Sequence, residues 1–351
     1  MRMIQGLVRT TLVVAVRVVL LAALLIALWL GVTSAMRMLR EQASPATLAP
    51  TGGRWIDAGD ARIYTQAWGP TDGPLVVLVH GTGAWSGTWF ELPQALASAG
   101  WRVVALDLPP FGMSERVAPA LGFDYSRAAQ ARRVLSVIDA LETGPVVLVG
   151  HSFGAGPALE AAVQSPSRLR KLVLVDPALG LGAAGEAPAC TPPGPGLAWL
   201  LEPAIAPRLL RASAVSATAT LPPLTGHWLG GFVHRREAVT PQRVAAYQHP
   251  FARSDFSAVL GDWAAGFAQG GCETAASLQP ERLTAWARAQ ALPVELLWGE
   301  ADTVTPIAQA KALQAWMPGA RLHVLPGLGH IPHIEDPGAF SAVLREVIGA
   351  R

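Results

Sequence analysis

One serine stands between two glycines, in the sequence Gly-His-Ser-Phe-Gly at residues 150–154, directly after the aliphatic run at residues 146–149. A short motif of this kind also arises by chance. A serine hydroxyl is a weak nucleophile at neutral pH, and it needs a base, a group that orients the base, and donors for an oxyanion. We expect Ser152 to occupy a sharp turn after a strand, with Gly154 leaving room for the next helix to pack closely.

Two residues late in the chain can complete a triad with Ser152. Asp302 lies in the loop after the aliphatic run at residues 293–297, and His330 follows the Gly-Leu-Gly turn at residues 327–329. The order Ser, Asp, His is the one that accompanies a nucleophile on this kind of turn. Asp302 is therefore the candidate orienting carboxylate, and His330 is the candidate general base.

Each of these two residues has an alternative interpretation and a competitor nearby. Asp302 is of a residue type that is favoured at helix N-caps, and a histidine at position 330 is also compatible with a capping or buried packing role. Glu300 is a nearer carboxylate, but it lies closer to its strand. His333 lies beyond a proline and is the weaker candidate base.

Backbone amides are the expected donors for the oxyanion. The residue after the nucleophile, Phe153, opens the following helix, where the helix dipole also favours negative charge. The second donor is expected from the sequence His-Gly-Thr-Gly at residues 80–83, and Thr82 is our candidate, with Gly83 next. A simple glycine turn at a strand end is the alternative for this loop.

The elements that must position these residues alternate between short aliphatic runs and helical stretches. A hairpin is expected first, at residues 54–58 and 61–65, and the aliphatic runs then indicate a parallel sheet covered on both faces. The alternation stops near residue 177 and resumes at residue 293, with an insertion rich in Ala, Pro, Leu and Trp between them that we interpret as mostly helical. The expected strands are 74–79, 102–108, 145–149, 172–175, 293–297 and 321–325, and the expected helices are 87–99, 125–141, 154–164, 306–316 and 339–348.

The N-terminal segment has the composition of a membrane anchor. Residues 18–35 carry no charge, and Arg17 is the only charged residue from position 12 to position 35. We predict a short tail at 1–11, an uncleaved transmembrane helix at 12–36 and a linker at 37–53. A cleaved signal peptide is the alternative, although its apolar region is usually shorter. The distribution of arginines favours a catalytic domain on the non-cytoplasmic side.

Composition excludes some classes of protein and leaves others open. The net charge is +2, with scattered basic residues, so no nucleic-acid partner is expected. Residues 180–185 fit the pattern G-x-G-x-x-G, but the prolines that follow allow no helix to receive a pyrophosphate, and no cofactor or metal is predicted. Cys190 and Cys272 are equally compatible with a disulfide and with two free thiols. The oligomeric state is not indicated.

The motifs together resemble the α/β-hydrolase superfamily, in its serine-nucleophile branch with a helical cap. They are H-G-T-G at 80–83, D-L-P-P-F-G-M-S at 107–114, G-H-S-F-G at 150–154, G-E-A-D-T-V-T-P at 299–306 and G-H-I-P-H-I-E at 329–335. The resemblance implies an eight-stranded, mostly parallel sheet, a core at 54–177 and 293–351, and a helical cap at 178–292. Esterases, carbon–carbon bond hydrolases and haloperoxidase-like enzymes are members of this superfamily that share this set of motifs.

The resemblance also carries expectations for single residues. It implies Ser152 as nucleophile, His330 as base and then acid, and Asp302 as the orienting carboxylate. Some relatives carry an acid after the sixth strand, so Asp176 is a second candidate for the acid. Epoxide hydrolases and haloalkane dehalogenases are similar in fold but use Asp as nucleophile, which Ser152 disfavours. Pro110 departs from the family pattern, which commonly has Gly there.

The substrate is the least determined part of the prediction. Tryptophans are frequent in the cap and beside residues 80–83, and we take Trp85 and Trp228 as candidate substrate contacts, with core packing as the alternative. We predict a serine hydrolase that forms an acyl-enzyme from a small apolar ester or thioester. A carbon–carbon bond hydrolase, or a ligand-binding or signalling module with slow residual hydrolysis, remains the alternative.

Overall fold

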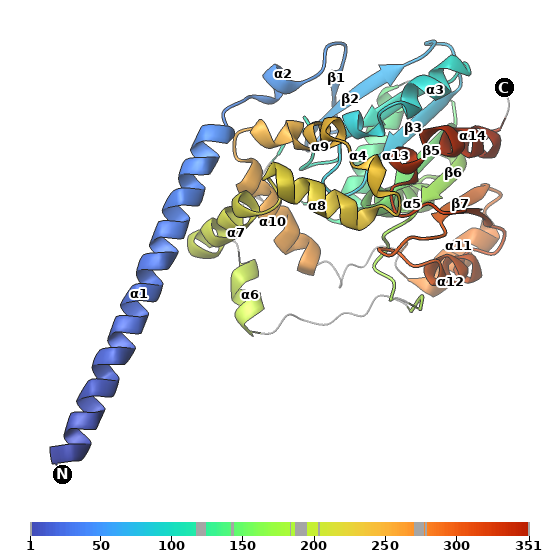
Figure 1. Ribbon diagram of the computed structural model, residues 1–351. Coiled ribbons are helices and arrows are strands. Elements are labelled where there is room, and N and C mark those ends of the chain that lie inside the picture. Colours follow the sequence, from blue (N-terminus) through green and yellow to red (C-terminus); the bar gives the residue numbers. More distant parts are fainter. Residues whose placement is uncertain are drawn as a thin grey trace.

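The computed structural model describes residues 2–116, 124–141, 144–182, 184–186, 195–202, 204–269, 277 and 279–349. Within this part of the chain, eight strands form one sheet in the order β1-β2-β4-β3-β5-β6-β7-β8 (Figure 1). The hairpin β1–β2 is antiparallel, as is the pair β2–β4, whereas β3 to β8 are parallel. The strands are β1 Arg54–Asp57, β2 Arg62–Trp68, β3 Leu75–Val79, β4 Arg102–Leu106, β5 Val146–His151, β6 Leu169–Val175, β7 Val294–Gly299 and β8 Arg321–Leu325.

The central strands are apolar throughout because helices cover both faces of the sheet. In β3, Val77 and Val79 belong to one hydrophobic cluster, while Val76 and Leu78 belong to another on the opposite face. The first cluster contains side chains of α4 (Arg127–Ala140), α5 (Ala155–Gln164), α11 (Pro280–Ala289) and α12 (Ala308–Trp316). The second contains side chains of α3 (Leu92–Ser98) and α14 (Pro337–Ile348). Because β3 to β8 are parallel, their carboxyl ends lie at one edge of the sheet, and this is the edge where ligands bind in such sheets.

The region between β6 and β7 is helical, as predicted. Its helices are α6 Pro195–Leu201, α7 Ile205–Ala217, α8 Pro222–Phe232, α9 Pro241–Gln248 and α10 Phe256–Gln269, followed by α11. Helices α7 and α10 pack together around Asp262, which accepts hydrogen bonds of 2.7 Å from both Arg208 and Arg211. Leu283 of α11 is fully buried in the core cluster, so this helix packs with the sheet although it lies within the predicted cap range 178–292.

The N-terminal helix α1 spans Arg2–Arg40, and it extends away from the rest of the protein (Figure 1). It is long and apolar enough to cross a membrane, a test that a signal sequence also passes. The helix continues into the predicted linker because no glycine or proline interrupts residues 33–44. Ser44 then caps a second short helix, α2 (Pro45–Leu48), by accepting a hydrogen bond from the Thr47 amide.

The segment with the G-x-G-x-x-G pattern forms a turn after β6. The Gly185 amide donates to the Gly182 carbonyl at 2.8 Å, and the next helix along the described residues, α6, begins only at Pro195. Among the described residues of this segment, 180–182 and 184–186, no helix begins that could receive a pyrophosphate. Cys190 and Cys272 lie outside the described residues, so their pairing stays a prediction.

Candidate active site

Ser152 occupies a strained turn between β5 and α5. Its φ angle is +51°, a conformation that costs energy for a residue with a side chain. A Cβ added at Gly150 would lie 2.7 Å from the Cα of Ala155, and one at Gly154 would overlap the carbonyl oxygen of His80. Gly150 thus lets α5 pack closely on β5. Gly154, the N-cap residue of α5, lets the start of the same helix pack closely on the end of β3, which is the role predicted for it.

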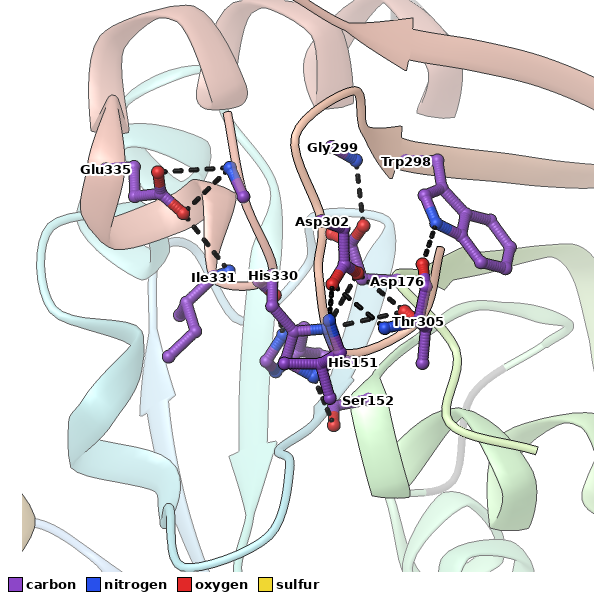
Figure 2. Close-up of polar contacts among 12 residues, drawn as sticks. His151, Ser152, Asp176, Trp298, Gly299, Asp302, Thr305, His330, Ile331 and Glu335 are labelled. Carbon is purple, nitrogen blue, oxygen red and sulfur yellow. Dashed lines mark hydrogen bonds and ion pairs between the residues drawn. The ribbon is translucent and has the colours of Figure 1, made fainter. Parts of the chain in front are cut away.

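The turn brings Ser152 to the two residues that the sequence paired with it. The Ser152 hydroxyl lies 2.9 Å from Nε2 of His330, and Nδ1 of His330 lies 2.8 Å from Oδ2 of Asp302 (Figure 2). All three residues are buried, with 7%, 4% and 6% of their surfaces exposed, respectively. This geometry fits a Ser-His-Asp triad, in which the carboxylate fixes the imidazole tautomer and the imidazole accepts the serine proton.

Asp302 is held as a carboxylate by donors from its own loop. Its Oδ1 accepts from the amides of Val304 (2.7 Å) and Thr305 (2.9 Å), and its Oδ2 accepts from the Thr305 hydroxyl at 2.5 Å. Burial acts to raise the pKa of Asp302, but His330 and the Thr305 donors outweigh it and lower the pKa below its usual value. Thr305 was given no role in the sequence analysis. Its position in the motif at 299–306 is the signal that points to it.

Asp176, the second candidate for the acid, lies beside Asp302 after β6 (Figure 2). Its Oδ1 accepts from the Gly299 amide at 2.8 Å, and its buried Oδ2 has no hydrogen-bond partner among the residues that the structure describes. Burial, together with the negative charge of Asp302, raises the pKa of Asp176 well above its usual value. The surroundings of Asp176 thus disfavour its charged form, whereas those of Asp302, which is in contact with His330, favour it. The geometry therefore favours Asp302 as the orienting carboxylate.

The loop that carries His330 is fixed by side chains on both sides. Nε2 of His151 lies 2.8 Å from the carbonyl oxygen of His330 and donates to it. Glu335 accepts hydrogen bonds from the amides of Gly329 (3.0 Å) and Ile331 (3.4 Å), the two neighbours of His330 (Figure 2). Burial and the neighbouring His330 lower the pKa of His151 to about 3, so this imidazole is neutral and its proton sits on one nitrogen. Glu335 and His151 are positioning residues that the sequence analysis did not assign.

The candidate oxyanion donors lie against the nucleophile. A Cβ at Gly81 would be 3.0 Å from the Cβ of Ser152, so the His-Gly-Thr-Gly loop passes directly beside the serine. Thr82 follows in this loop and is exposed, while Phe153 is the middle residue of the 3₁₀ turn Ser152–Gly154. The loop and the turn bring both backbone segments to Ser152. Their role as an oxyanion hole stays a prediction.

The weaker candidates have other partners. Glu300 accepts from the Gly327 amide at 3.2 Å. His333 is buried with its ring 4.7 Å from Trp89 and 5.0 Å from His151, and burial lowers its pKa well below the usual value.

The two candidate tryptophans lie in different environments. Trp85 is 5% exposed, its indole N–H donates to the Ala246 carbonyl at 2.9 Å, and its ring stacks on His249. Trp228 is 56% exposed on α8. Trp85 thus has the contacts of a packing residue, and the surroundings of Trp228 are those of a surface residue.

The fold and the site together define a serine-type α/β hydrolase arrangement. The chain belongs to the alpha/beta hydrolase family, whose model matches residues 76–343. The protein is accordingly a hydrolase, and the recognition of this superfamily from the sequence motifs is confirmed.

Known proteins similar to this chain differ in the substrate that their names give. A 2-hydroxymuconate semialdehyde hydrolase of Pseudomonas sp. (strain CF600) is 30% identical over 308 residues, which is 86% of this chain and 95% of the relative. The structure of a meta-cleavage product hydrolase from Pseudomonas fluorescens matches with a TM-score of 0.64 at 21% identity, over 84% of this chain and 97% of that one. The structure of a membrane phospholipase A, described as a bacterial virulence factor, matches with a TM-score of 0.62 at 22% identity, over 99% of this chain and 97% of that one.

Proposed function

We propose that this protein is a membrane-anchored serine hydrolase that cleaves an apolar carboxylic ester or thioester through an acyl-enzyme. The observation that carries the proposal is the continuous contact from Ser152 through His330 to Asp302, at 2.9 and 2.8 Å, on a strained turn after β5. A serine in this arrangement has the base that it needs to act as a nucleophile at neutral pH.

In the first half of the reaction, the Ser152 oxygen bonds to the substrate carbonyl carbon while Nε2 of His330 takes the serine proton. The resulting oxyanion accepts hydrogen bonds from the backbone amides of Thr82 and Phe153. The bond from carbon to the leaving oxygen or sulfur then breaks, and His330 returns the proton to the leaving group. Asp302 stabilises the imidazolium and keeps its own charge throughout.

In the second half, water releases the acyl group. His330 takes a proton from water as the water oxygen bonds to the acyl carbon, and the proton returns to Ser152 as the ester bond to the serine breaks. The net reaction consumes one water and yields a carboxylic acid with an alcohol or thiol. No redox step is involved.

Aromatic side chains around Ser152 favour an apolar substrate. The ring of Trp263 lies 5.4 Å from that of Phe153 and 4.9 Å from that of Phe111. Rings in edge contact of this kind form an apolar wall beside the serine, suited to an acyl chain.

A carbon–carbon bond hydrolase is the second candidate, because a relative with 30% identity over 86% of this chain bears the name of a semialdehyde hydrolase. A panel of p-nitrophenyl esters from acetate to palmitate, run beside a ring-cleavage product of catechol, separates the two. The proposal expects Ser152-dependent ester turnover that rises with acyl length. If the protein turned over the ring-cleavage product and none of the esters, the carbon–carbon bond hydrolase would replace the ester hydrolase as the proposed function.

We further propose that α1 stays attached and spans a bilayer. The arginines on the two sides of its apolar stretch favour the non-cytoplasmic side for the hydrolase domain. The apolar side chains at 13–32 are exposed along the helix, which supports a lipid surrounding.

A further inference from the structure

The last turns of α1 are fixed to the cap. Thr33 of α1 is 2% exposed, and its carbonyl oxygen accepts from the hydroxyl of Ser216 on α7 at 3.4 Å. Arg40, seven residues further on, donates to Ser216 (3.2 Å) and to Ser257 of α10 (3.3 Å). After the helix, the main chain at Ala43 forms a parallel bridge with Arg253. The anchor and the cap are therefore held in one orientation.

The first buried residue of α1 after its apolar stretch marks the level of the bilayer surface. Among the residues whose side-chain exposure is described, which begin at Val13, large apolar side chains are exposed along the 20 residues up to Val32. These 20 residues span about 30 Å at 1.5 Å per residue, the thickness of a hydrocarbon core. The first buried contact with the cap comes at the next residue, Thr33. A bilayer that surrounds this stretch thus ends where the cap begins.

The cap exposes large apolar side chains near this level. Trp199 of α6 is 47% exposed, and Ile205 and Leu209, one turn apart on α7, are 80% and 45% exposed. We call these three residues the cap corner. In Figure 1, α6 and α7 lie on the side of the protein toward which α1 extends. Removal of such side chains from water is favourable, so their exposure to water is unfavourable.

Charged groups around the cap corner are compatible with lipid headgroups. Glu202 is exposed between α6 and α7, and Arg208 reaches the buried Asp262 with its side chain 38% exposed. A mixture of apolar side chains with a few charges at the rim is the composition of surfaces that rest in a membrane interface. Tryptophan is also enriched at the membrane–water interface of membrane proteins.

Helix α10 connects the cap corner to the nucleophile. One side of α10 packs on α7 through Asp262 and Arg211, which are 2.7 Å apart. The same helix carries Trp263, whose ring contacts Phe153 beside Ser152. The side of the cap nearest the bilayer is thus one helix away from the apolar wall of the site.

We infer that the cap corner rests in the interface of the bilayer that α1 spans, and that the enzyme takes its substrate from this bilayer as an acyl ester of a membrane lipid. The second part rests on the proposed function and names its substrate class. Water and the lipid ester give a fatty acid and the deacylated lipid through the two half-reactions described above.

The position of the cap corner is tested without reference to activity. The full chain with Cys190→Ser and Cys272→Ser receives a single Ile205→Cys, carries the fluorophore NBD there, and is placed in phosphatidylcholine nanodiscs. A matched protein carries the label at Val324→Cys, because Val324 is 44% exposed on the edge strand β8, outside the cap. Nitroxide-labelled lipid is expected to quench the label at position 205 at least threefold more than the label at 324. Equal quenching, or chain-to-chain disulfide crosslinking of the unlabelled Ile205→Cys protein with no quenching of its labelled form, would overturn the membrane contact in favour of a water-exposed or dimer surface.

The lipid substrate is tested with the double variant Ile205→Asp/Leu209→Asp and the control Val324→Asp. On dioleoylphosphatidylcholine vesicles, the double variant is expected to lose at least tenfold in fatty-acid release while the control keeps the wild-type rate. Both are expected to keep their rate on soluble p-nitrophenyl butyrate, which also shows that they are folded. Wild-type turnover of the butyrate without release of fatty acid from vesicles would overturn the lipid substrate. Inactivity of the wild type on every ester would instead overturn the proposed function, whatever the quenching experiment gives.

Discussion

Replacing Asp302 by Asn tests which carboxylate orients the base. In the protein, Oδ1 of Asp302 accepts two loop amides and Oδ2 faces Nδ1 of His330 at 2.8 Å. Asparagine keeps the amide contacts through its oxygen and turns its NH₂ group toward Nδ1. His330 must then accept at Nδ1 and carry its proton on Nε2, where it can no longer accept the proton of Ser152.

The size of the effect follows from this tautomer. The base that lies 2.9 Å from the Ser152 oxygen is lost, while the backbone donors and the apolar wall remain. Loss of a triad base by a tautomer change costs about 10³- to 10⁴-fold in kcat, which is about 4–5 kcal/mol in the barrier at 1.36 kcal/mol per decade. The folded state is expected to be retained, since asparagine has nearly the same shape as aspartate.

The acylation rate is the appropriate measurement. Stopped-flow release of p-nitrophenol in the first turnover reports the attack of Ser152 without the later deacylation step. Asp302→Asn is expected to slow this phase about 10³-fold or more at pH 7.5, with an unchanged urea midpoint.

Asp176→Asn is the matched control. Burial and the charge of Asp302 raise the pKa of Asp176 and so favour its neutral form, and a neutral amide of the same shape is therefore expected to slow acylation less than tenfold. If Asp176→Asn were slowed as much as Asp302→Asn, or if Asp302→Asn stayed within tenfold of the wild type, the assignment of Asp302 would be refuted.

Three further outcomes follow from the structure. Gly150→Ala is expected to lower the free energy of unfolding by about 1–3 kcal/mol in urea titrations, because the added Cβ would press on α5. Gly144→Ala is the control and is expected to be neutral, because its added Cβ meets open space. Equal effects of the two substitutions would contradict the packing argument. Burial lowers the pKa of His80 to about 4 and that of His151 to about 3, so below pH 6.5 these two histidines bind fewer protons in the native state than in the unfolded chain. The free energy of unfolding should therefore fall on acidification. The pKa of Asp107, which burial raises to about 6, offsets part of this loss. A net loss on the order of 1 kcal/mol between pH 6 and pH 5 is expected in urea titrations, and a gain would contradict the neutral histidines. A C-terminal alkaline phosphatase fusion is expected to be active in cells, and an inactive but expressed fusion would reverse the orientation of the anchor.

The sequence was sufficient to predict the parts of the fold that depend on short-range patterns. Aliphatic runs of five or six residues, such as Leu75–Val79, predicted strands buried on both faces, and the motif order predicted which loops meet Ser152. Pairing across the sheet then brought Asp302 and His330 together, although 28 residues separate them and 178 separate His330 from Ser152.

Features that depend on three-dimensional contact were not predictable in the same way. The pattern predicted the close packing at Gly154 but not the second close approach at Gly150, whose added Cβ would lie 2.7 Å from the Cα of Ala155. Burial of Asp176 beside Asp302 raises the pKa of Asp176, and no local sequence pattern predicts that the two carboxyl groups lie close together. The same holds for Glu335, whose carboxylate accepts amides from the His330 loop and from His234 in the cap.

The identity of the nucleophile is the central claim, and covalent labelling tests it most directly. Purified full-length protein is treated with a fluorophosphonate, digested and analysed by mass spectrometry, beside Ser152→Ala and the wild type denatured before treatment. The account predicts stoichiometric label on the peptide that contains Ser152 in the folded wild type, and no label in the other two samples. Folded wild type that takes no label, or that is labelled at another residue, would contradict the account and favour a ligand-binding role for the fold.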